Sequence, residues 1–140
     1  MPDERFLPID AEDAKLIAAA QDVLRRNYRA GRHTVGAAVL CESGKIYTGI
    51  DVEACGYGPC AEPIAIGAAF SNGEREIRKI VAVRKTGAEY PVLSPCGNCR
   101  QLVFDYSPDA IVIFNLDGQV RKTAVRNLLP GAYASGFDED

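Results

Sequence analysis

The sequence lacks any apolar run long enough to cross a bilayer, and residues 1–10 lack the basic-then-apolar pattern of a targeting segment. It also lacks an excess of positive charge, since its formal net charge is −3. An acidic balance argues against an extended phosphate-binding surface. No repeat, low-complexity tract or linker divides the chain. These absences predict a cytoplasmic protein that binds neither a membrane nor a nucleic-acid polymer.

Histidine is nearly absent, and cysteine is present in an odd number. The chain has 140 residues, five cysteines and a single histidine, His33. A chain of this length can bury a substantial core without disulfides, so we expect a single domain over residues 1–140. The cysteine spacing is unlike that of a small secreted framework, which favours metal or redox chemistry over disulfide bonding.

The pattern of apolar residues and turn signals predicts an α/β protein with the element order α-β-β-α-β-α-β-β-α. The expected helices and strands cover residues 11–28, 34–41, 45–50, 60–71, 77–84, 96–106, 110–114, 119–122 and 123–129. Small residues in the first strand, beginning with Gly36, indicate that another element packs closely against it. Residues 86–95 are expected to be irregular, and Tyr133 and Phe137 form an aromatic tail. This order predicts a central five-stranded mixed sheet between helical layers.

Two short motifs carry the chemistry. Residues 57–63 (Tyr-Gly-Pro-Cys-Ala-Glu-Pro) and 94–101 (Ser-Pro-Cys-Gly-Asn-Cys-Arg-Gln) each form a Gly/Pro-marked turn that runs into a helix. Each motif therefore places a cysteine at a helix N-terminus. Three thiols, from Cys60, Cys96 and Cys99, could then meet in space. A catalytic zinc uses three protein ligands and keeps the fourth position for water, and Glu62 lies two residues from the first thiol.

This residue set suits hydrolytic deamination, in which water replaces an amino group on an aromatic ring carbon. Bound zinc lowers the pKa of water from near 15.7 to about 7. Glu62 is placed to move protons from the water to the ring and to the departing ammonia. Three thiolates leave a zinc site with negative charge, which two helix N-termini would offset. Arg100 could add hydrogen bonds to thiolate sulfur.

Blander interpretations of the same residues remain open. A structural zinc site would need a fourth ligand from Cys41, Cys55 or His33. Cys96 and Cys99 alone could form a thiol–disulfide oxidoreductase, because a helix N-terminus lowers a thiol pKa. That alternative gives no role to Cys60 or Glu62. A non-catalytic zinc module, and an enzyme acting on polynucleotides, are further alternatives; the acidic balance and the lack of a basic, aromatic-interleaved stretch disfavour the latter.

The two motifs together resemble those of the zinc-dependent cytidine deaminase superfamily, with its Cys/His-X-Glu and Pro-Cys-X-X-Cys pattern. The resemblance covers residues 31–133, including 35–39, 48–53 and 128–133. Residues 58–62 and 33–35 look more like blasticidin-S deaminase. Glu53 and the Leu-Leu-Pro-Gly-Ala-aromatic ending look more like the cytidine enzymes.

The resemblance implies a three-layer αβα sandwich, a zinc cofactor and a homotetramer whose active sites are completed across subunit boundaries. It implies metal ligands Cys60, Cys96 and Cys99, with Glu62 as proton shuttle. The implied reaction is deamination of a cytosine nucleoside (cytidine, deoxycytidine or a blasticidin-S-like compound) to the uracil form, or of another aminated heterocycle.

The resemblance also supplies candidate substrate-binding residues, each of which could instead be an ordinary loop or packing residue. They are Thr34, His33, Asp51, Glu53 and, in a neighbouring subunit's site, Tyr133. The chain departs from the family pattern at three of its positions. Asp51 stands where cytidine enzymes usually carry Asn, His33 stands where an aromatic residue packs on the base, and Pro63 stands where many three-cysteine members carry Arg. The last departure leaves more charge compensation to Arg100.

Overall fold

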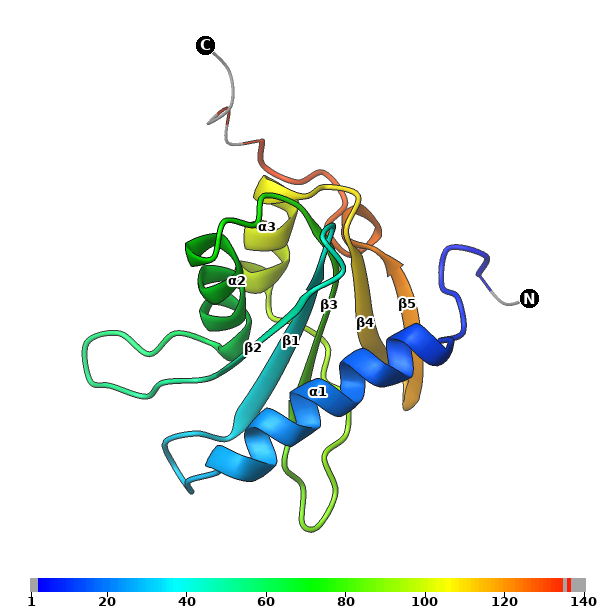
Figure 1. Ribbon diagram of the computed structural model, residues 1–140. Helices are drawn as coiled ribbons and strands as arrows, with labels where there is room; N and C mark the ends of the chain where they lie inside the picture. The colour runs from blue at the N-terminus through cyan, green and yellow to red at the C-terminus, as the bar shows by residue number, and fades with distance from the viewer. Residues whose placement is uncertain (1–2, 135, 137–140) are drawn as a thin grey trace.

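The computed structural model describes residues 3–134 and residue 136, and its centre is a mixed sheet (Figure 1). The strands in the described part of the chain are β1 (Val35–Cys41), β2 (Ile46–Ile50), β3 (Ile77–Arg84), β4 (Ile111–Leu116) and β5 (Gln119–Ala124). Their order across the sheet is β2-β1-β3-β4-β5. Strand β3 pairs with β4 in parallel, and the other neighbours are antiparallel. The predicted five-stranded mixed sheet is confirmed.

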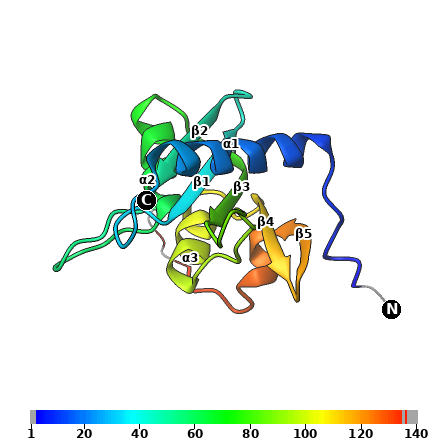
Figure 2. The ribbon, with the colours of Figure 1, turned by 90° about the horizontal axis from the view of Figure 1, so that it is seen from below.

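Helices cover both faces of this sheet. Helix α1 (Ala11–Asn27) crosses one face, whereas α2 (Ala61–Ser71) and α3 (Gly97–Tyr106) lie on the other (Figures 1 and 2). Each face has its own apolar cluster. Leu16, Ala20 and Leu24 of α1 pack on one side, and Ala65 of α2 and Val103 of α3 pack on the other. The predicted three-layer αβα arrangement is therefore confirmed.

Glycines allow the helices to lie close to the strands. A Cβ atom built on Gly36 of β1 would lie 2.5 Å from the carbonyl oxygen of Ala20 in α1. A Cβ atom on Gly49 of β2 would lie 2.6 Å from the backbone nitrogen of Ala65 in α2. These close approaches confirm the prediction that small residues in the first strand accommodate a packed neighbour.

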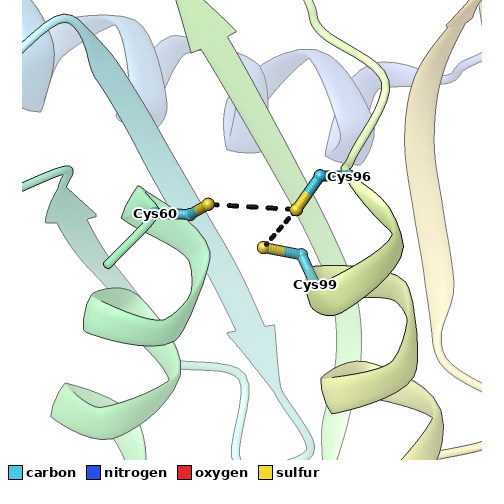
Figure 3. Close-up of side chains that lie close together, drawn as sticks. All are labelled: Cys60, Cys96 and Cys99. Atoms are coloured by element: carbon cyan, nitrogen blue, oxygen red, sulfur yellow. Dashed lines mark hydrogen bonds between the residues drawn. The ribbon is translucent and has the colours of Figure 1, made fainter. Parts of the chain in front are cut away.

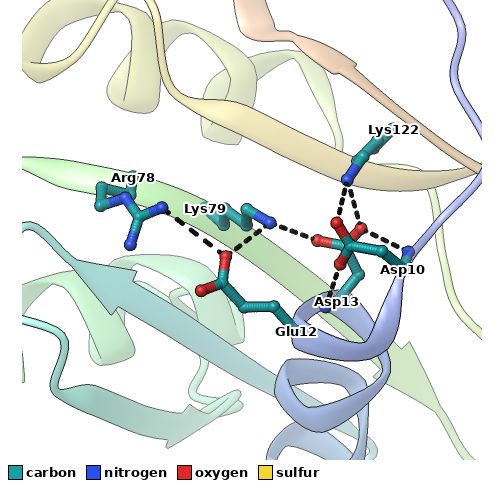
Figure 4. Close-up of polar contacts among 6 residues, drawn as sticks. All are labelled: Asp10, Glu12, Asp13, Arg78, Lys79 and Lys122. Carbon is teal, nitrogen blue, oxygen red and sulfur yellow. Dashed lines mark hydrogen bonds and ion pairs between the residues drawn. The ribbon is translucent and has the colours of Figure 1, made fainter.

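A buried ion-pair network joins the start of α1 to the sheet (Figure 4). Asp10 and Asp13 form a reciprocal capping box at the N-terminus of the helix. The Asp13 carboxylate, which is fully buried, accepts hydrogen bonds from Lys79 of β3 at 2.7 Å and from Lys122 of β5 at 2.6 Å. This network connects three elements that lie far apart in the sequence.

One predicted helix is wrong. Residues 123–129 were expected to be helical, but Thr123 and Ala124 complete β5, and a 3₁₀ turn, η1, covers Val125–Leu128. Thr123 pairs with Val112 in β4 and is buried, so sheet pairing outweighs the local helical pattern. Phe137 of the expected aromatic tail lies outside the described residues. Within the described ranges, no helix is both long and apolar enough to cross a membrane.

Candidate active site

Each motif contains a cysteine that immediately precedes a helix. Cys60 is the N-cap of α2 and Cys96 is the N-cap of α3, each with extended backbone (φ −63°, ψ 167° and φ −71°, ψ 169°). Neither side chain caps its own helix, so both sulfur atoms are free to point away from it. Cys99 follows in the first turn of α3. The predicted placement of cysteine at two helix N-termini is confirmed.

The three sulfur atoms lie together between the two helices (Figure 3). The Sγ atoms of Cys60 and Cys96 are 3.9 Å apart, and those of Cys96 and Cys99 are 3.5 Å apart. All three lie within 4.8 Å of one another. A tetrahedral zinc with Zn–S bonds of about 2.3 Å separates its sulfur ligands by roughly 3.8 Å. The three thiols therefore fit zinc with little movement.

The structure does not close this cluster with a fourth protein ligand. Among the described residues, the group able to hold a metal consists of Cys60, Cys96 and Cys99 alone. Cys41 is buried in β1, where burial raises its pKa to about 11. Cys55 is exposed in a loop, and Nδ1 of His33 lies 2.8 Å from the backbone oxygen of Asp51. A three-ligand site leaves a coordination position for water, as catalytic zinc sites do.

Glu62 lies in the first turn of α2, beside the sulfur cluster. Only 6% of its surface is exposed. Burial raises the pKa of the Glu62 carboxyl above its ordinary value, and the charge of nearby Asp51 raises it further. A raised pKa brings the carboxyl group closer to the condition in which it can both accept and release a proton, as a general acid–base requires.

Backbone N–H groups at the start of α3 favour a thiolate at Cys96. Burial raises the pKa of this thiol, but the N–H group of Cys99, the thiols of Cys99 and Cys60 and the N–H group of Asn98 oppose that effect, and the net pKa falls below the ordinary value. Burial raises the pKa of Cys60 and of Cys99, and the Glu62 charge adds to the effect at both. A bound cation would favour the thiolate form of both side chains, because metal ligation requires loss of the thiol proton.

Arg100 braces the motif around Cys96. Its Nε donates to the Pro95 carbonyl at 2.8 Å, and its Nη1 donates to the Leu128 carbonyl at 3.0 Å. These two bonds hold the turn before α3 against the end of η1. Nε and Nη1 of Arg100 thus donate to carbonyl oxygens. A hydrogen bond from Arg100 to a thiolate sulfur stays a prediction.

A cleft of about 260 Å³ opens beside the thiols. Three of the sequence-predicted substrate residues, Thr34, Asp51 and Glu53, line it together with Cys60 and Glu62. Most of the Tyr133 side chain is exposed, and the tyrosine is not among the cleft residues of its own chain; its carbonyl accepts a hydrogen bond from Gln101 at the start of α3.

Sequence reasoning missed one charged residue in the cleft, Arg84 at the end of β3. The alternation of side chains along a strand was the available signal, because residues two apart share a face of the sheet. Arg84 therefore follows Ile80 and Ala82, which belong to the core beneath α2 and α3.

Comparison with known proteins agrees with this geometry. The model of the "Cytidine and deoxycytidylate deaminase zinc-binding region" matches residues 10–115. A blasticidin-S deaminase of Bacillus cereus is 37% identical over 132 residues, covering 89% of this chain and 94% of the relative. A cytidine deaminase of Sporosarcina psychrophila is 38% identical over 125 residues, covering 86% of this chain and 90% of the relative.

Solved structures show the same fold. The crystal structure of cytidine deaminase from Burkholderia pseudomallei superposes with a TM-score of 0.71 and 32% sequence identity, covering 89% of this chain and all of that one. The matched region contains both cysteine motifs, and the three thiols have the spacing that zinc requires. The chain therefore belongs to the cytidine and deoxycytidylate deaminase family, whose members share this zinc-binding region.

Proposed function

We propose that this chain, a zinc-dependent hydrolytic deaminase, converts a cytosine nucleoside to its uracil form and releases ammonia. Relatives named cytidine deaminase and blasticidin-S deaminase align with most of the chain, and their names describe deamination. The observation that carries the proposal is the meeting of three sulfur atoms and a buried carboxyl group at one cleft.

In this proposal Cys60, Cys96 and Cys99 hold the zinc ion. Bound zinc supplies a water molecule of lowered pKa at the vacant coordination position. Glu62 would accept a proton from the attacking water on a carboxylate oxygen and deliver it to the ring nitrogen. It would then take the remaining proton of the hydroxyl group formed on the ring carbon and deliver it to the amino group, which leaves as ammonia. The raised pKa of the buried Glu62 supports this shuttle, because the carboxyl group must gain and lose a proton in each turnover.

Glu53 and Thr34 are proposed to bind the sugar side of the substrate, and Asp51 is proposed to hold Thr34 in position for this. All three line the cleft, and Glu53 is exposed there. Asp51 is 4% exposed and already accepts backbone hydrogen bonds, so its contribution is to position the strand end. His33 is proposed to act beside it, since its ring contacts the Asp51 carbonyl.

The proposal extends to assembly and location. In the proposed homotetramer, Tyr57, which is 74% exposed, and Tyr133, which is 73% exposed, are free to reach a neighbour's cleft. Sedimentation or light scattering of the zinc-loaded protein tests this assembly.

The five free cysteines support a reducing, cytoplasmic setting, because a zinc–thiolate site needs reduced sulfur.

The deciding experiment replaces Glu62 with Gln, which keeps the size of the side chain and removes the proton-carrying oxygen. We expect zinc content and fold to persist while kcat for cytidine deamination falls by about 100-fold or more. Ammonia release gives the rate, and metal analysis gives zinc per chain. Near wild-type turnover in a zinc-loaded Glu62→Gln protein would falsify the mechanism.

A substrate panel separates the two named activities of the relatives. Cytidine, deoxycytidine and blasticidin-S are compared by ammonia release under identical conditions, with another aminated heterocycle as the fourth compound. The thiol–disulfide alternative predicts no zinc-dependent ammonia release and leaves Cys60, 3.9 Å from Cys96, without a role.

A further inference from the structure

We infer that Arg84 is a specificity residue that binds an anionic group, a carboxylate or a phosphate, on the sugar of the nucleoside. This inference rests on the proposed function and narrows its substrate class. Arg84 is the last residue of β3 and lies in the same cleft as Cys60, Cys96 and Glu62.

The strand register directs the Arg84 side chain to the active-site face. Arg84 pairs with Val35 of β1, and Ala82 pairs with Ala37. Ala37 and Ala82 belong to the apolar cluster beneath α2 and α3, and Val35 packs against that cluster. Since alternate residues of a strand share a face, Arg84 lies on the face that carries the thiols and not on the face covered by α1.

The guanidinium of Arg84 has no protein partner in the part of the chain that the structure describes. None of the ion pairs or side-chain hydrogen bonds of residues 3–134 involves it. Its backbone N–H donates to the Pro91 carbonyl at 3.1 Å, so the main chain is fixed while the charged end is free. Other cations of this sheet, Lys79 and Lys122, are paired with carboxylates.

Arg84 is also the single basic residue among the described residues that line this cleft. The remaining charged groups of the lining are the acids Asp51, Glu53 and Glu62. Asp51 directs its carboxylate to backbone N–H groups of the adjoining strand, so it does not neutralise the arginine. An unpaired guanidinium offers a planar fork of donors that matches carboxylate and phosphate oxygens.

The chemistry of the reaction assigns this fork to the sugar end of the substrate. The amino-bearing ring carbon must lie next to the sulfur cluster and Glu62, which fixes the base at that side of the cleft. The other lining groups, Thr34, Glu53 and Arg84, are then left for the sugar and its substituents. An acidic sugar substituent would meet the free guanidinium.

A competing role for Arg84 is general compensation of the negative thiolate site. That role would change turnover of neutral and anionic substrates equally. Anion recognition changes the ratio of their kcat/KM values, so the ratio separates the two roles.

The experiment compares cytidine, cytidine 5′-carboxylate and cytidine 5′-phosphate as substrates of the zinc-loaded protein. We expect one anionic substrate to be preferred over cytidine, and the comparison of the two tells carboxylate from phosphate. In Arg84→Gln the anionic-to-neutral ratio of kcat/KM should fall about ten-fold or more. Arg84→Lys, which keeps the charge without the fork, should give an intermediate ratio, and added salt should lower the wild-type ratio.

Arg75→Gln is the matched control, because Arg75 is an exposed arginine outside this cleft whose Nη1 donates to the Glu74 carbonyl. Its ratio should equal that of the wild type. An unchanged ratio in Arg84→Gln, or no preference for either anion in the wild type, overturns the inference while leaving deamination intact.

Binding measurements keep the two proposals separable. Isothermal titration with uridine, uridine 5′-carboxylate and uridine 5′-phosphate reports anion recognition without turnover. If the wild type deaminates no cytosine nucleoside, the proposed function fails. Tighter binding of an anionic uridine that is lost in Arg84→Gln would still support the anion site, and its absence would overturn it.

Discussion

The carboxylate of Asp51 holds Thr34 at two points. Its Oδ1 accepts the Thr34 backbone N–H at 2.7 Å, and its Oδ2 accepts the Thr34 hydroxyl at 3.1 Å. The same Oδ1 accepts the N–H of Val35 at 2.9 Å. One buried side chain at the end of β2 thus fixes the entry to β1, and both segments line the cleft.

Replacement of Asp51 tests how much this clamp contributes. Asp51→Asn keeps an oxygen for the two backbone donors but cannot accept the hydroxyl, and we expect a loss of about 1 kcal/mol in unfolding free energy. Asp51→Ala leaves buried N–H groups without an acceptor and should lower the unfolding free energy by about 2–4 kcal/mol. Urea denaturation measures both values. Asp117→Asn, at an exposed turn, is the control; equal effects at the two sites would contradict the clamp.

Loss of any one thiol of the cluster should release the metal. Cys60→Ser, Cys96→Ser and Cys99→Ser each remove one of the three sulfur atoms, and we expect zinc to fall well below one ion per chain and deamination to be lost. Cys55→Ser is the matched control, because Cys55 is exposed and outside the cluster. Metal analysis of protein purified without chelator gives the stoichiometry. Full zinc retention in the three variants would contradict the assigned ligands.

Two glycine-to-alanine substitutions should have opposite effects on stability. In Gly36→Ala the new methyl group meets the Ala20 carbonyl at 2.5 Å, so we expect a loss of about 1–3 kcal/mol in unfolding free energy. In Gly67→Ala the methyl group meets nothing within 4 Å on an exposed face of α2, so we expect a gain of about 0.5–1 kcal/mol. Thermal or urea unfolding checks the signs, and a neutral Gly36→Ala would show that α1 and β1 can separate.

Acid should weaken the junction between α1 and the sheet. The Asp13 backbone N–H and then Lys122 lower the pKa of Asp10 below its ordinary value. A carboxyl whose pKa is depressed in the folded state stabilises the protein above its unfolded pKa of about 4, and this stability is lost as pH falls below that value.

Asp10→Asn, which can still cap the helix, should therefore flatten the dependence of stability on pH between about pH 4 and pH 2. Urea midpoints at several pH values measure the slope. Glu4→Gln serves as control because Glu4 lies outside the network. The same acid slope in Asp10→Asn as in the wild type would rule out this contribution.

The sequence predicted the elements that carry strong local signals. Pro and Gly beside Cys60 and Cys96 indicated where α2 and α3 begin, and a run of apolar residues located β3. The cysteine spacing predicted a shared metal site, because such a site requires only that the two helix N-termini that carry the cysteines face each other. Contacts of this kind follow from chain order and side-chain chemistry.

Other features depend on pairings between distant segments, which local patterns do not encode. The Asp13 network joins residues 66 and 109 positions away, so nothing near Asp13 in the sequence indicated it. The ending of β5 was misassigned because Thr123 gains its partner from β4. Arg84 was missed because its importance arises from the other residues that line the cleft.

The placement of the sulfur atoms on two separate helices ties metal uptake to assembly of the chain. Cys60 follows β2, Cys96 follows β3, and in the sheet β1 lies between those two strands. Folding must bring Cys60 to Cys96 and Cys99, because Cys60 and Cys96 lie 36 residues apart in the sequence. A bound ion would therefore favour the folded sheet over the unfolded chain. Removal of the ion would lower the unfolding free energy.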